Sequence, residues 1–325
     1  MLDAQIALQK DQFARAHRIF SRISALQELH IEPQYCSPFK LQHDIEQMRY
    51  LLKKRKLPKK FKEDISRYTA GLALCRKIGT DFIPLIPSLK EYLGPNYGTL
   101  FHLFIPGKTE KFALNQRQDF AFIEQEYLAL KNPIVVIDQV LSKASLRKLR
   151  KMILESAIWH DIKPNAHLGA RLTYGLSSPL VFQIAAELKQ KLPKVFAGLS
   201  LKQVWAFKYA PKNSGIETHS DGGLVNLNMW LTPDEDNIDP STGGMAIYER
   251  RRPTSWTLNQ ANGYDNLSAV KRLVSQPKVK RIAVPYRFNR GVLFDSRLFH
   301  ETDRFHFRDT YVGRRVNLTF LFDRD

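Results

Sequence analysis

His219, Asp221 and His300 have the types and spacing of metal ligands. His219 and Asp221 are two positions apart, and His300 follows 79 residues after Asp221. In an extended segment, side chains at i and i+2 point to the same side, so both members of the pair can reach one interior. Two imidazoles and one carboxylate can hold one face of an octahedral ferrous ion and leave the opposite face open for a cosubstrate and O2. The pattern predicts oxygenase chemistry, although an H-x-D pair taken alone is more often an exposed loop pair.

Arg315 supplies a second charged group. Residues 315–322 alternate as in a strand, with Arg315, Asn317 and Thr319 on one face and apolar residues on the other. If the first face is buried, the guanidinium needs an anionic partner, because an unpaired buried charge is costly. No acidic residue is near on that face, so we expect a bound dicarboxylate, held by two parallel hydrogen bonds. The alternative is an exposed arginine on an edge strand.

Together these residues resemble the Fe(II)- and 2-oxoglutarate-dependent dioxygenases of the double-stranded β-helix fold. The resemblance is carried by His219-x-Asp221, His300 and Arg315-x-Asn317, in that order. The Tyr-Ala-Pro step at 209–211 and the Arg-x-Asn-Leu-Thr-Phe segment at 315–320 are similar to the 2-oxoglutarate-binding elements of AlkB-type members. Segments similar to bacterial prolyl-hydroxylase-like oxygenases are 230–233, 243–248, 298–302 and 314–317. The resemblance covers roughly residues 133 to 325.

The resemblance implies a role for each of these positions. His219, Asp221 and His300 would hold Fe(II), and Arg315 would pair with the far carboxylate of 2-oxoglutarate. The residues implied to hydrogen-bond the cosubstrate are Tyr209 and Asn317. O2 would be consumed, and succinate and CO2 released. Members that transfer halide have a small residue at the position of Asp221, so the carboxylate present here favours hydroxylation.

Two further segments suggest substrate contacts. The strand expected at 225–231 places Asn228 and Trp230 on one face; if this face looks inward, Asn228 reaches the cosubstrate and Trp230 walls the substrate pocket. The alternative places Trp230 in the core and Asn228 in solvent. Residues 249–281 interrupt the barrel and are long enough for a lid. Within them, Arg250 and Arg252 could bind a carboxylate or phosphate of the substrate, or lie in an exposed turn.

Three residues near the distal histidine need a separate interpretation. Asp295 and Glu301 flank His300, and either is a candidate to orient its ring. His306 stands between aromatic residues in a segment that we expect to be an outward loop, so we predict that it is a bystander.

The expected fold class is α+β: a double-stranded β-helix (jelly-roll, cupin-like) core with buttressing helices and an N-terminal helical domain. A boundary near Asn132-Pro133 divides a mainly helical accessory domain, 1–132, from the oxygenase domain, 133–325. Periodic apolar residues predict helices over 39–52, 64–77, 146–159 and 179–192. Ser142 is the expected N-cap of the third.

Composition places the chain among ordinary globular proteins. Apolar residues make up 43% and charged residues 25%. The N-terminus lacks the pattern of a secretory signal, and no segment approaches the ~18 apolar residues of a membrane helix. We therefore expect a cytoplasmic protein with no membrane contact, in which Cys36 and Cys75 are reduced.

The chain is strongly basic, with 50 Lys and Arg against 32 Asp and Glu, a net charge of +18. The excess is spread through both predicted domains, which argues against a dedicated nucleic-acid arm. Its densest part, residues 53–62, carries seven positive charges and is typical of a solvated helix end, although it can also contact phosphates or acidic protein.

The favoured function is hydroxylation of an amino acid, free, in a peptide or in a biosynthetic intermediate, so the expected partner is a small-molecule or peptide substrate. An AlkB-like nucleic-acid demethylase is the alternative; it is not favoured, because the matching elements serve the cosubstrate that all branches share. A non-catalytic scaffold is disfavoured by the intact ligand set. The sequence gives no signal for the oligomeric state.

Overall fold

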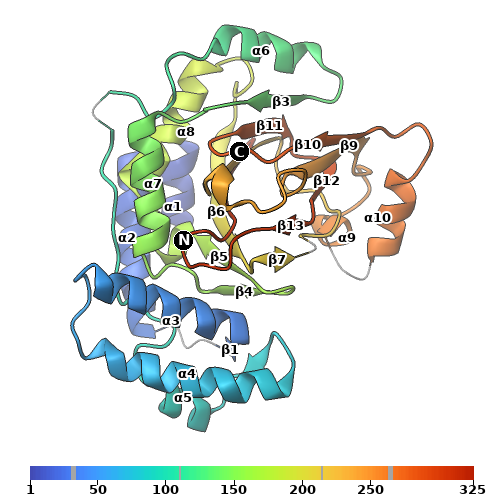
Figure 1. Cartoon of the computed structure of the whole chain (residues 1–325). Coiled ribbons are helices and arrows are strands. Elements are labelled where there is room, and N and C mark those ends of the chain that lie inside the picture. Colours follow the sequence, from blue (N-terminus) through green and yellow to red (C-terminus); the bar gives the residue numbers. More distant parts are fainter. Residues whose placement is uncertain (31–33, 110, 214, 263–265) are drawn as a thin grey trace.

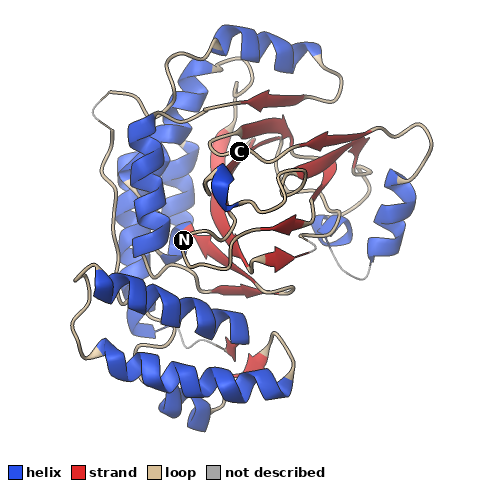
Figure 2. Cartoon of the chain, viewed as in Figure 1, coloured by secondary structure: helices blue, strands red, loops and turns tan. Residues whose placement is uncertain are grey.

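The computed structural model describes residues 1–325 apart from 31–33, 110, 214 and 263–265. Strands gather in the centre of the molecule and most helices lie to one side of them and below (Figures 1 and 2). The helices are α1 Leu2–Gln9, α2 Phe13–His30, α3 Pro38–Lys53, α4 Phe61–Ile78, α5 Pro87–Leu93, α6 Phe120–Ala129, α7 Lys143–Glu155, α8 Pro179–Lys191, α9 Leu258–Asn262 and α10 Leu267–Val274. The strands are β1 Tyr35–Cys36, β2 Ile83–Pro84, β3 Ile134–Ile137, β4 Asp161–Lys163, β5 His167–Arg171, β6 Ser200–Tyr209, β7 Lys212–Asn213, β8 Val225–Trp230, β9 Met245–Arg251, β10 Arg281–Val284, β11 Gly291–Asp295, β12 Leu298–Thr302, β13 Phe305–His306 and β14 Val316–Asp323.

Two unequal antiparallel sheets form the core. The larger has the strand order β3-β11-β8-β14-β6-β5-β4 and the smaller has the order β10-β9-β12, while β7 and β13 form a separate pair. Apolar side chains from both sheets meet in one cluster, which includes Trp230, Ile247, Phe294 and Leu298. This arrangement confirms the predicted α+β class with an antiparallel core of the double-stranded β-helix type and an N-terminal helical region.

The outer face of the larger sheet is covered by helices. Leu149 of α7 and Leu180 and Ile184 of α8 lie in the same apolar cluster as the outward residues of β6 and β14. Ser142 accepts a hydrogen bond from the backbone N–H of Ser145, as the predicted N-cap should. The helix predicted over 146–159 differs, because it begins at Lys143 and ends at Glu155, where the chain becomes extended.

The predicted accessory domain packs in two ways. Helices α1 and α2 join the core of the larger sheet, where Phe13 stacks on Phe182 of α8 with ring centroids 5.6 Å apart. In contrast, α3, α4 and α5 enclose a separate apolar cluster, in which the sulfur atoms of Cys36 and Cys75 are 3.9 Å apart. The boundary near residue 132 stays a prediction.

The segment expected to form a lid is an insertion between two paired strands. Arg281 of β10 pairs with Tyr248 of β9, so the chain leaves the smaller sheet after β9 and returns to it at β10. The two short helices α9 and α10 lie between them, on the opposite side of the sheets from α7 (Figure 1).

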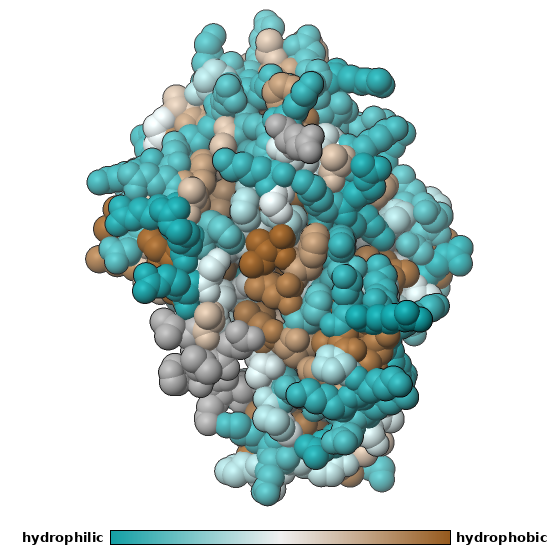
Figure 3. All heavy atoms as spheres, turned by 90° about the vertical axis from the view of Figure 1, so that its left-hand side faces the viewer, coloured by the Kyte–Doolittle hydropathy of each residue, from teal (hydrophilic) through white to brown (hydrophobic). Residues whose placement is uncertain are grey.

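The face of the molecule shown in Figure 3 is predominantly hydrophilic. On the face shown in Figure 3, hydrophilic side chains surround a smaller central area of hydrophobic ones. Within the described part of the chain, each helix is too short or too polar to cross a membrane. The cellular location stays a prediction.

Lys208 is buried on the outer face of β6, although Tyr209 beside it faces the space between the sheets. The Nζ atom of Lys208 lies 3.6 Å from the centroid of the Tyr311 ring and has no hydrogen-bond partner among the described residues. Burial, assisted by the positive charge of Arg314, lowers the pKa of Lys208 well below its usual value. Keeping this ammonium charged inside the protein therefore costs stability.

We predict that Lys208→Met raises the free energy of unfolding at pH 7 by about 1–3 kcal/mol, because an apolar side chain removes the cost of burying an amino group that has no hydrogen-bond partner in the described structure. The folded-state pKa lies below that of the unfolded chain, so the unfolded state binds more protons up to about pH 10.5. Wild-type stability thus rises with pH in this window, and the advantage of the variant shrinks. Urea denaturation at pH 7 and pH 9.5 measures both effects, with exposed Lys62→Met as the control. A variant that is less stable at pH 7 would contradict the prediction.

Candidate metal centre

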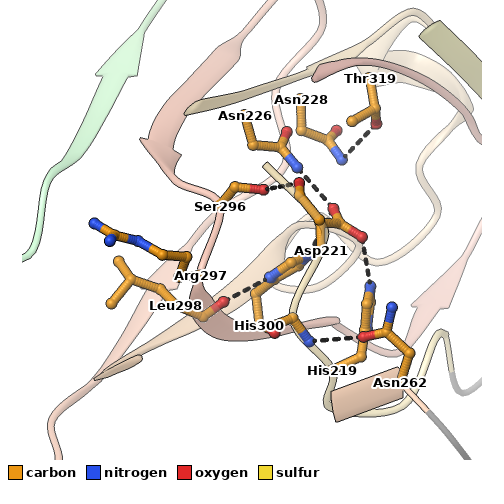
Figure 4. Close-up of polar contacts among 12 residues, drawn as sticks. His219, Asp221, Asn226, Asn228, Asn262, Ser296, Arg297, Leu298, His300 and Thr319 are labelled. Carbon is orange, nitrogen blue, oxygen red and sulfur yellow. Dashed lines mark hydrogen bonds and ion pairs between the residues drawn. The ribbon is translucent and has the colours of Figure 1, made fainter. Parts of the chain in front are cut away.

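His219, Asp221 and His300 converge on one point. His219 and Asp221 lie in the segment between β7 and β8, and His300 lies in β12. Two backbone hydrogen bonds join the histidines: His219 N donates to His300 O (2.9 Å), and His300 N donates to His219 O (2.8 Å). His219 Nε2 is 3.7 Å from Asp221 Oδ1, and His300 Nε2 is 3.4 Å from Asp221 Oδ2 (Figure 4). One possible ligand atom of each of the three residues lies within 4.8 Å of the other two.

Both imidazoles are oriented by backbone carbonyls. Nδ1 of His219 is 2.7 Å from the carbonyl oxygen of Glu217, and Nδ1 of His300 is 3.0 Å from that of Leu298. These contacts assign the proton to Nδ1 and leave the Nε2 lone pair directed toward Asp221. Burial, with a smaller contribution from His300, lowers the pKa of His219 and favours the neutral ring that binds a metal.

Asp221 is held in its ionised form. Burial by itself would raise its pKa, but the imidazoles of His300 and His219 beside it and the amide of Asn226 together bring the pKa below its usual value. Asn226 Nδ2 donates to Asp221 Oδ2 at 2.7 Å (Figure 4). This role of Asn226 was not predicted; its signal in the sequence is the position of Asn226 on the same face of β8 as Asn228.

We predict that Asn226→Ala weakens Fe(II) binding about 10- to 100-fold, the usual effect of losing a residue that orients a metal ligand. The amide proton fixes the carboxylate of Asp221, which can rotate without it. Equilibrium titration with Fe(II) under anaerobic conditions measures the dissociation constant. An unchanged constant in the variant would show that the hydrogen bond does not organise the site.

The metal triad opens into a cavity of about 300 Å³. Its walls contain every residue predicted to bind the metal or the cosubstrate; these are Tyr209, His219, Asp221, Asn228, His300, Arg315 and Asn317. The neighbouring strands β6, β14 and β8 direct their side chains into it: Tyr209 N pairs with Arg315 O, and Thr319 lies opposite Asn228. Arg315, Asn317 and Thr319 therefore face the cavity, which is the first of the two orientations that the sequence left open.

Arg315 is buried, with 2% of its surface exposed. Its Nε donates to Gly243 O (2.9 Å), its Nη1 is 3.4 Å from Asn317 Oδ1, and the guanidinium carbon lies 4.9 Å from the centroid of the Tyr209 ring. Over the described residues, no carboxylate pairs with it. A Cβ at Gly244 would lie 1.9 Å from Val284 O, so only glycine allows the backbone at this position to approach Val284 so closely.

Three polar atoms around the cavity are buried without a hydrogen-bond partner in the described structure: Tyr209 Oη, Asn228 Oδ1 and Trp230 Nε1. Buried polar atoms are normally satisfied, so these indicate a ligand or ordered water in the cavity. Together with the unpaired charge of Arg315, the hydroxyl of Tyr209 and the indole N–H supply donors for an anion. The residues present fit a dicarboxylate beside a metal held by the triad.

Trp230 lies both in the core and on the wall of the cavity, the two positions that the sequence left open for it. It is fully buried and stacks on Tyr286 with ring centroids 5.2 Å apart, yet it also lines the cavity. Arg250 and Arg252 are outside the described lining of this cavity. Arg252 Nη1 instead donates a hydrogen bond to the backbone oxygen of Asp221 at 2.5 Å, so Arg252 contacts the backbone of the segment that carries His219 and Asp221. Substrate binding by either arginine stays a prediction without support from this geometry.

The two acidic residues beside His300 have other partners. Asp295 accepts hydrogen bonds from Arg251 and Arg297, and Glu301 binds the hydroxyl of Tyr248. The orienting contact of His300 comes from a backbone carbonyl instead, as described above. His306 is exposed in β13 and, in the described structure, does not line the cavity.

A hairpin that was not predicted from the sequence closes one side of the cavity. Strands β4 and β5 pair around a three-residue turn, in which Asn165 and Ala166 adopt positive φ, and they bring Lys163 and His167 to the cavity wall. The Pro164-Asn165 step was a turn signal that could have indicated it. His167 stacks on Tyr209, with ring centroids 5.2 Å apart, and burial lowers its pKa to about 4.

Neither a protein-family model nor a curated protein sequence matches this chain. Solved structures do. The 2-oxoglutarate-dependent epimerase SnoN from nogalamycin biosynthesis matches with a TM-score of 0.42 and 13% identity, over 63% of this chain and 83% of that one. A Pseudomonas putida prolyl-4-hydroxylase matches at 0.41 and 13%, over 63% and 99%, and HygX from Streptomyces hygroscopicus, with nickel and 2-oxoglutarate bound, matches at 0.40 and 14%, over 65% and 88%.

At TM-scores near 0.4 these likenesses carry no argument about activity, so the case for function rests on the geometry of the site. The chain matches, at low similarity, solved structures described as an alpha-ketoglutarate-dependent epimerase and as a member of the 2OG-Fe(II) oxygenase family. It also contains a His-x-Asp pair and a distal histidine whose side chains converge.

Proposed function

We propose that this protein is an Fe(II)- and 2-oxoglutarate-dependent dioxygenase that hydroxylates an amino acid, free, in a peptide or in a biosynthetic intermediate. One observation carries the proposal: the three possible metal ligands and the buried Arg315, which no carboxylate pairs with in the described structure, line the same cavity. A metal triad alone fits many reactions. A metal triad facing an arginine that lacks an anion fits a metal-bound dicarboxylate.

His219, Asp221 and His300 would hold the metal through two neutral imidazoles and one carboxylate. Their fixed Nδ1 contacts present preformed ligand atoms, so little reorganisation accompanies metal binding. When bound, Fe(II) and 2-oxoglutarate supply the oxidative chemistry, in which O2 is consumed, succinate and CO2 are released and a C–H bond is hydroxylated.

Arg315 would bind the far carboxylate of 2-oxoglutarate. Asn317 and the carbonyl of Gly243 already orient its guanidinium, and the Tyr209 hydroxyl stands ready to donate a second hydrogen bond. The buried surroundings strengthen these polar contacts and exclude water from the cosubstrate. Asn228 and Trp230 would contact the cosubstrate or substrate from β8.

Calorimetric titration of 2-oxoglutarate into the anaerobic protein, with and without Fe(II), tests the first half of the proposal. We expect binding that depends on Fe(II), and its absence would refute the assignment. A panel of amino acids and short peptides, with Fe(II), 2-oxoglutarate and ascorbate in air, tests the second half. A substrate will increase succinate formation and gain one oxygen by mass spectrometry. Oxidative demethylation of methylated oligonucleotides, without activity on the panel, would instead support the AlkB-like alternative.

A further inference from the structure

A second cavity of about 430 Å³ adjoins the metal cavity. Lys163, Trp205 and Phe207 line both cavities, so these three side chains form the boundary that the two cavities share. The outer cavity extends from this boundary along β5 and β6 toward α1, and Asn262 of α9 lies on its wall. Asn262 also accepts a hydrogen bond from Ser220 N, which places this wall directly beside the metal-binding segment.

Aromatic rings line the route from one cavity to the other. Trp205, Phe207 and Tyr209 alternate along β6 and therefore lie on one face of the strand. The ring centroids of Trp205 and Phe207 are 6.4 Å apart, and those of Phe207 and Tyr209 are 6.5 Å apart. Trp205 and Phe207 are partly exposed, whereas Tyr209 is buried at the inner end. Partly exposed rings in a cavity bind planar apolar groups well.

Gly169 of β5 makes room for this aromatic surface. A Cβ at this position would meet Phe207 Cε1 and Asp161 Oδ2, each at 3.2 Å. The absence of a Cβ lets the Phe207 ring lie against the neighbouring strand.

A positive charge lies beside the rings. Asp161 Oδ2 is 2.6 Å from Arg171 Nη2 and 3.1 Å from Lys163 Nζ, so two cations share one carboxylate oxygen. The side chains of Arg171 and Lys163 remain 53% and 31% exposed. Asp161 is the only acid among the described residues that line the outer cavity, and the cluster has donors left for a second anionic group.

We propose that the substrate combines a planar aromatic group with a carboxylate or phosphate. The aromatic group lies on Trp205 and Phe207, the anionic group binds Lys163 and Arg171, and the remainder reaches the metal cavity. This inference rests on the proposed function and narrows its substrate to aromatic amino-acid derivatives and related aromatic acids. It assigns recognition to β4, β5 and β6, which the sequence analysis did not consider for the substrate.

Binding of three small probes separates the two parts of the proposed recognition. Indole-3-acetate has both the ring and the charge, indole-3-acetamide lacks the charge, and cyclohexylacetate lacks the aromatic ring. The probes are titrated into the protein with Fe(II) and saturating 2-oxoglutarate, without O2, and followed by ligand-observed saturation-transfer NMR. We expect indole-3-acetate to bind about tenfold more tightly than either other probe. Equal affinity for all three, or no binding of indole-3-acetate, would overturn the proposal.

Variants place the binding in this cavity. Trp205→Ala should weaken indole-3-acetate binding about tenfold, and Trp205→Phe should restore part of it. Arg171→Gln should remove the preference for the acetate over the acetamide. Exposed Lys194→Gln controls for the general loss of a positive charge. Unchanged affinity in both Trp205→Ala and Arg171→Gln would refute the assigned position.

Calorimetry of 2-oxoglutarate on the same samples keeps the two proposals distinguishable. Arg171→Gln should bind 2-oxoglutarate as the wild type does, because Arg171 lines only the outer cavity and Arg315 and the triad are intact. Loss of 2-oxoglutarate binding in the wild type contradicts the proposed function. Normal 2-oxoglutarate binding without preference among the probes contradicts only the substrate class.

Discussion

His300→Ala should abolish substrate-dependent succinate formation and lower Fe(II) affinity at least about 100-fold. Changes to residues that merely orient a ligand cost 10–100-fold, and the loss of a ligand should exceed them. In the variant, only Asp221 and His219 remain as ligands for the metal. The backbone hydrogen bonds between residue 300 and His219 do not depend on the imidazole of His300. Local structure should therefore persist while the site fails. Anaerobic Fe(II) titration and a succinate assay measure the two losses.

His306→Ala is the matched control for this variant. His306 lies only six residues further along the chain and is exposed in β13. Its removal should leave both Fe(II) affinity and succinate formation at wild-type values. If His300→Ala bound Fe(II) as tightly as the wild type, or if the two histidine variants lost activity equally, the ligand assignment would be wrong.

The pairing of His219 with Asp221 was predictable because it depends on a spacing of two residues. The contact of His219 with His300 is long-range: His300 lies in β12, and the two histidines pair through their backbones. The alternation of polar and apolar residues from Arg315 to Phe320 predicted which side chains share a face, but it left open whether the face of Arg315 points inward. Both faces of β14 are buried, so the direction depends on which elements cover each face.

Other parts of the site depend on contacts between distant segments and leave little pattern. Lys163 and His167 belong to strands of three and five residues, too short for a periodicity to stand out. Arg252 was interpreted from its charge alone, yet the fold turns its guanidinium toward the backbone of Asp221. The packing of α1 and α2 against the larger sheet likewise appears only in tertiary structure, since an amphipathic pattern does not name the surface it will cover.

The inner and outer faces of β6 show how far adjacent residues can differ in role. Tyr209 points into the metal cavity with an unsatisfied hydroxyl, whereas Lys208 points outward into an aromatic enclosure. Both are buried polar groups without hydrogen-bond partners in the described structure. Tyr209 lies in a cavity large enough for a ligand, and we therefore assign it a function. Lys208 is packed against the Tyr311 ring, and we therefore assign it a stability cost.

Arg315→Ala should raise the concentration of 2-oxoglutarate required for half-maximal turnover about 30-fold or more. Truncating one partner of a buried, hydrogen-bonded charge pair costs about 2–5 kcal/mol, and each 1.4 kcal/mol is a factor of ten in affinity. The triad stays intact, so Fe(II) affinity without 2-oxoglutarate should change little. Turnover at saturating 2-oxoglutarate should fall much less than the requirement rises. Succinate formation over a range of 2-oxoglutarate concentrations measures both quantities.

Arg315→Lys is the conservative variant for this prediction, and Arg308→Ala is its control. Lysine keeps the charge but lacks the planar fork that grips a carboxylate through two hydrogen bonds, so its 2-oxoglutarate requirement should lie between those of the wild type and Arg315→Ala. Arg308 is an exposed arginine seven residues earlier, and its loss should leave the requirement unchanged. A wild-type requirement in Arg315→Ala would show that another group binds the far carboxylate. The donors that remain in the cavity, the Tyr209 hydroxyl and the Trp230 indole, would then be the residues to replace, because their unsatisfied protons face the same space.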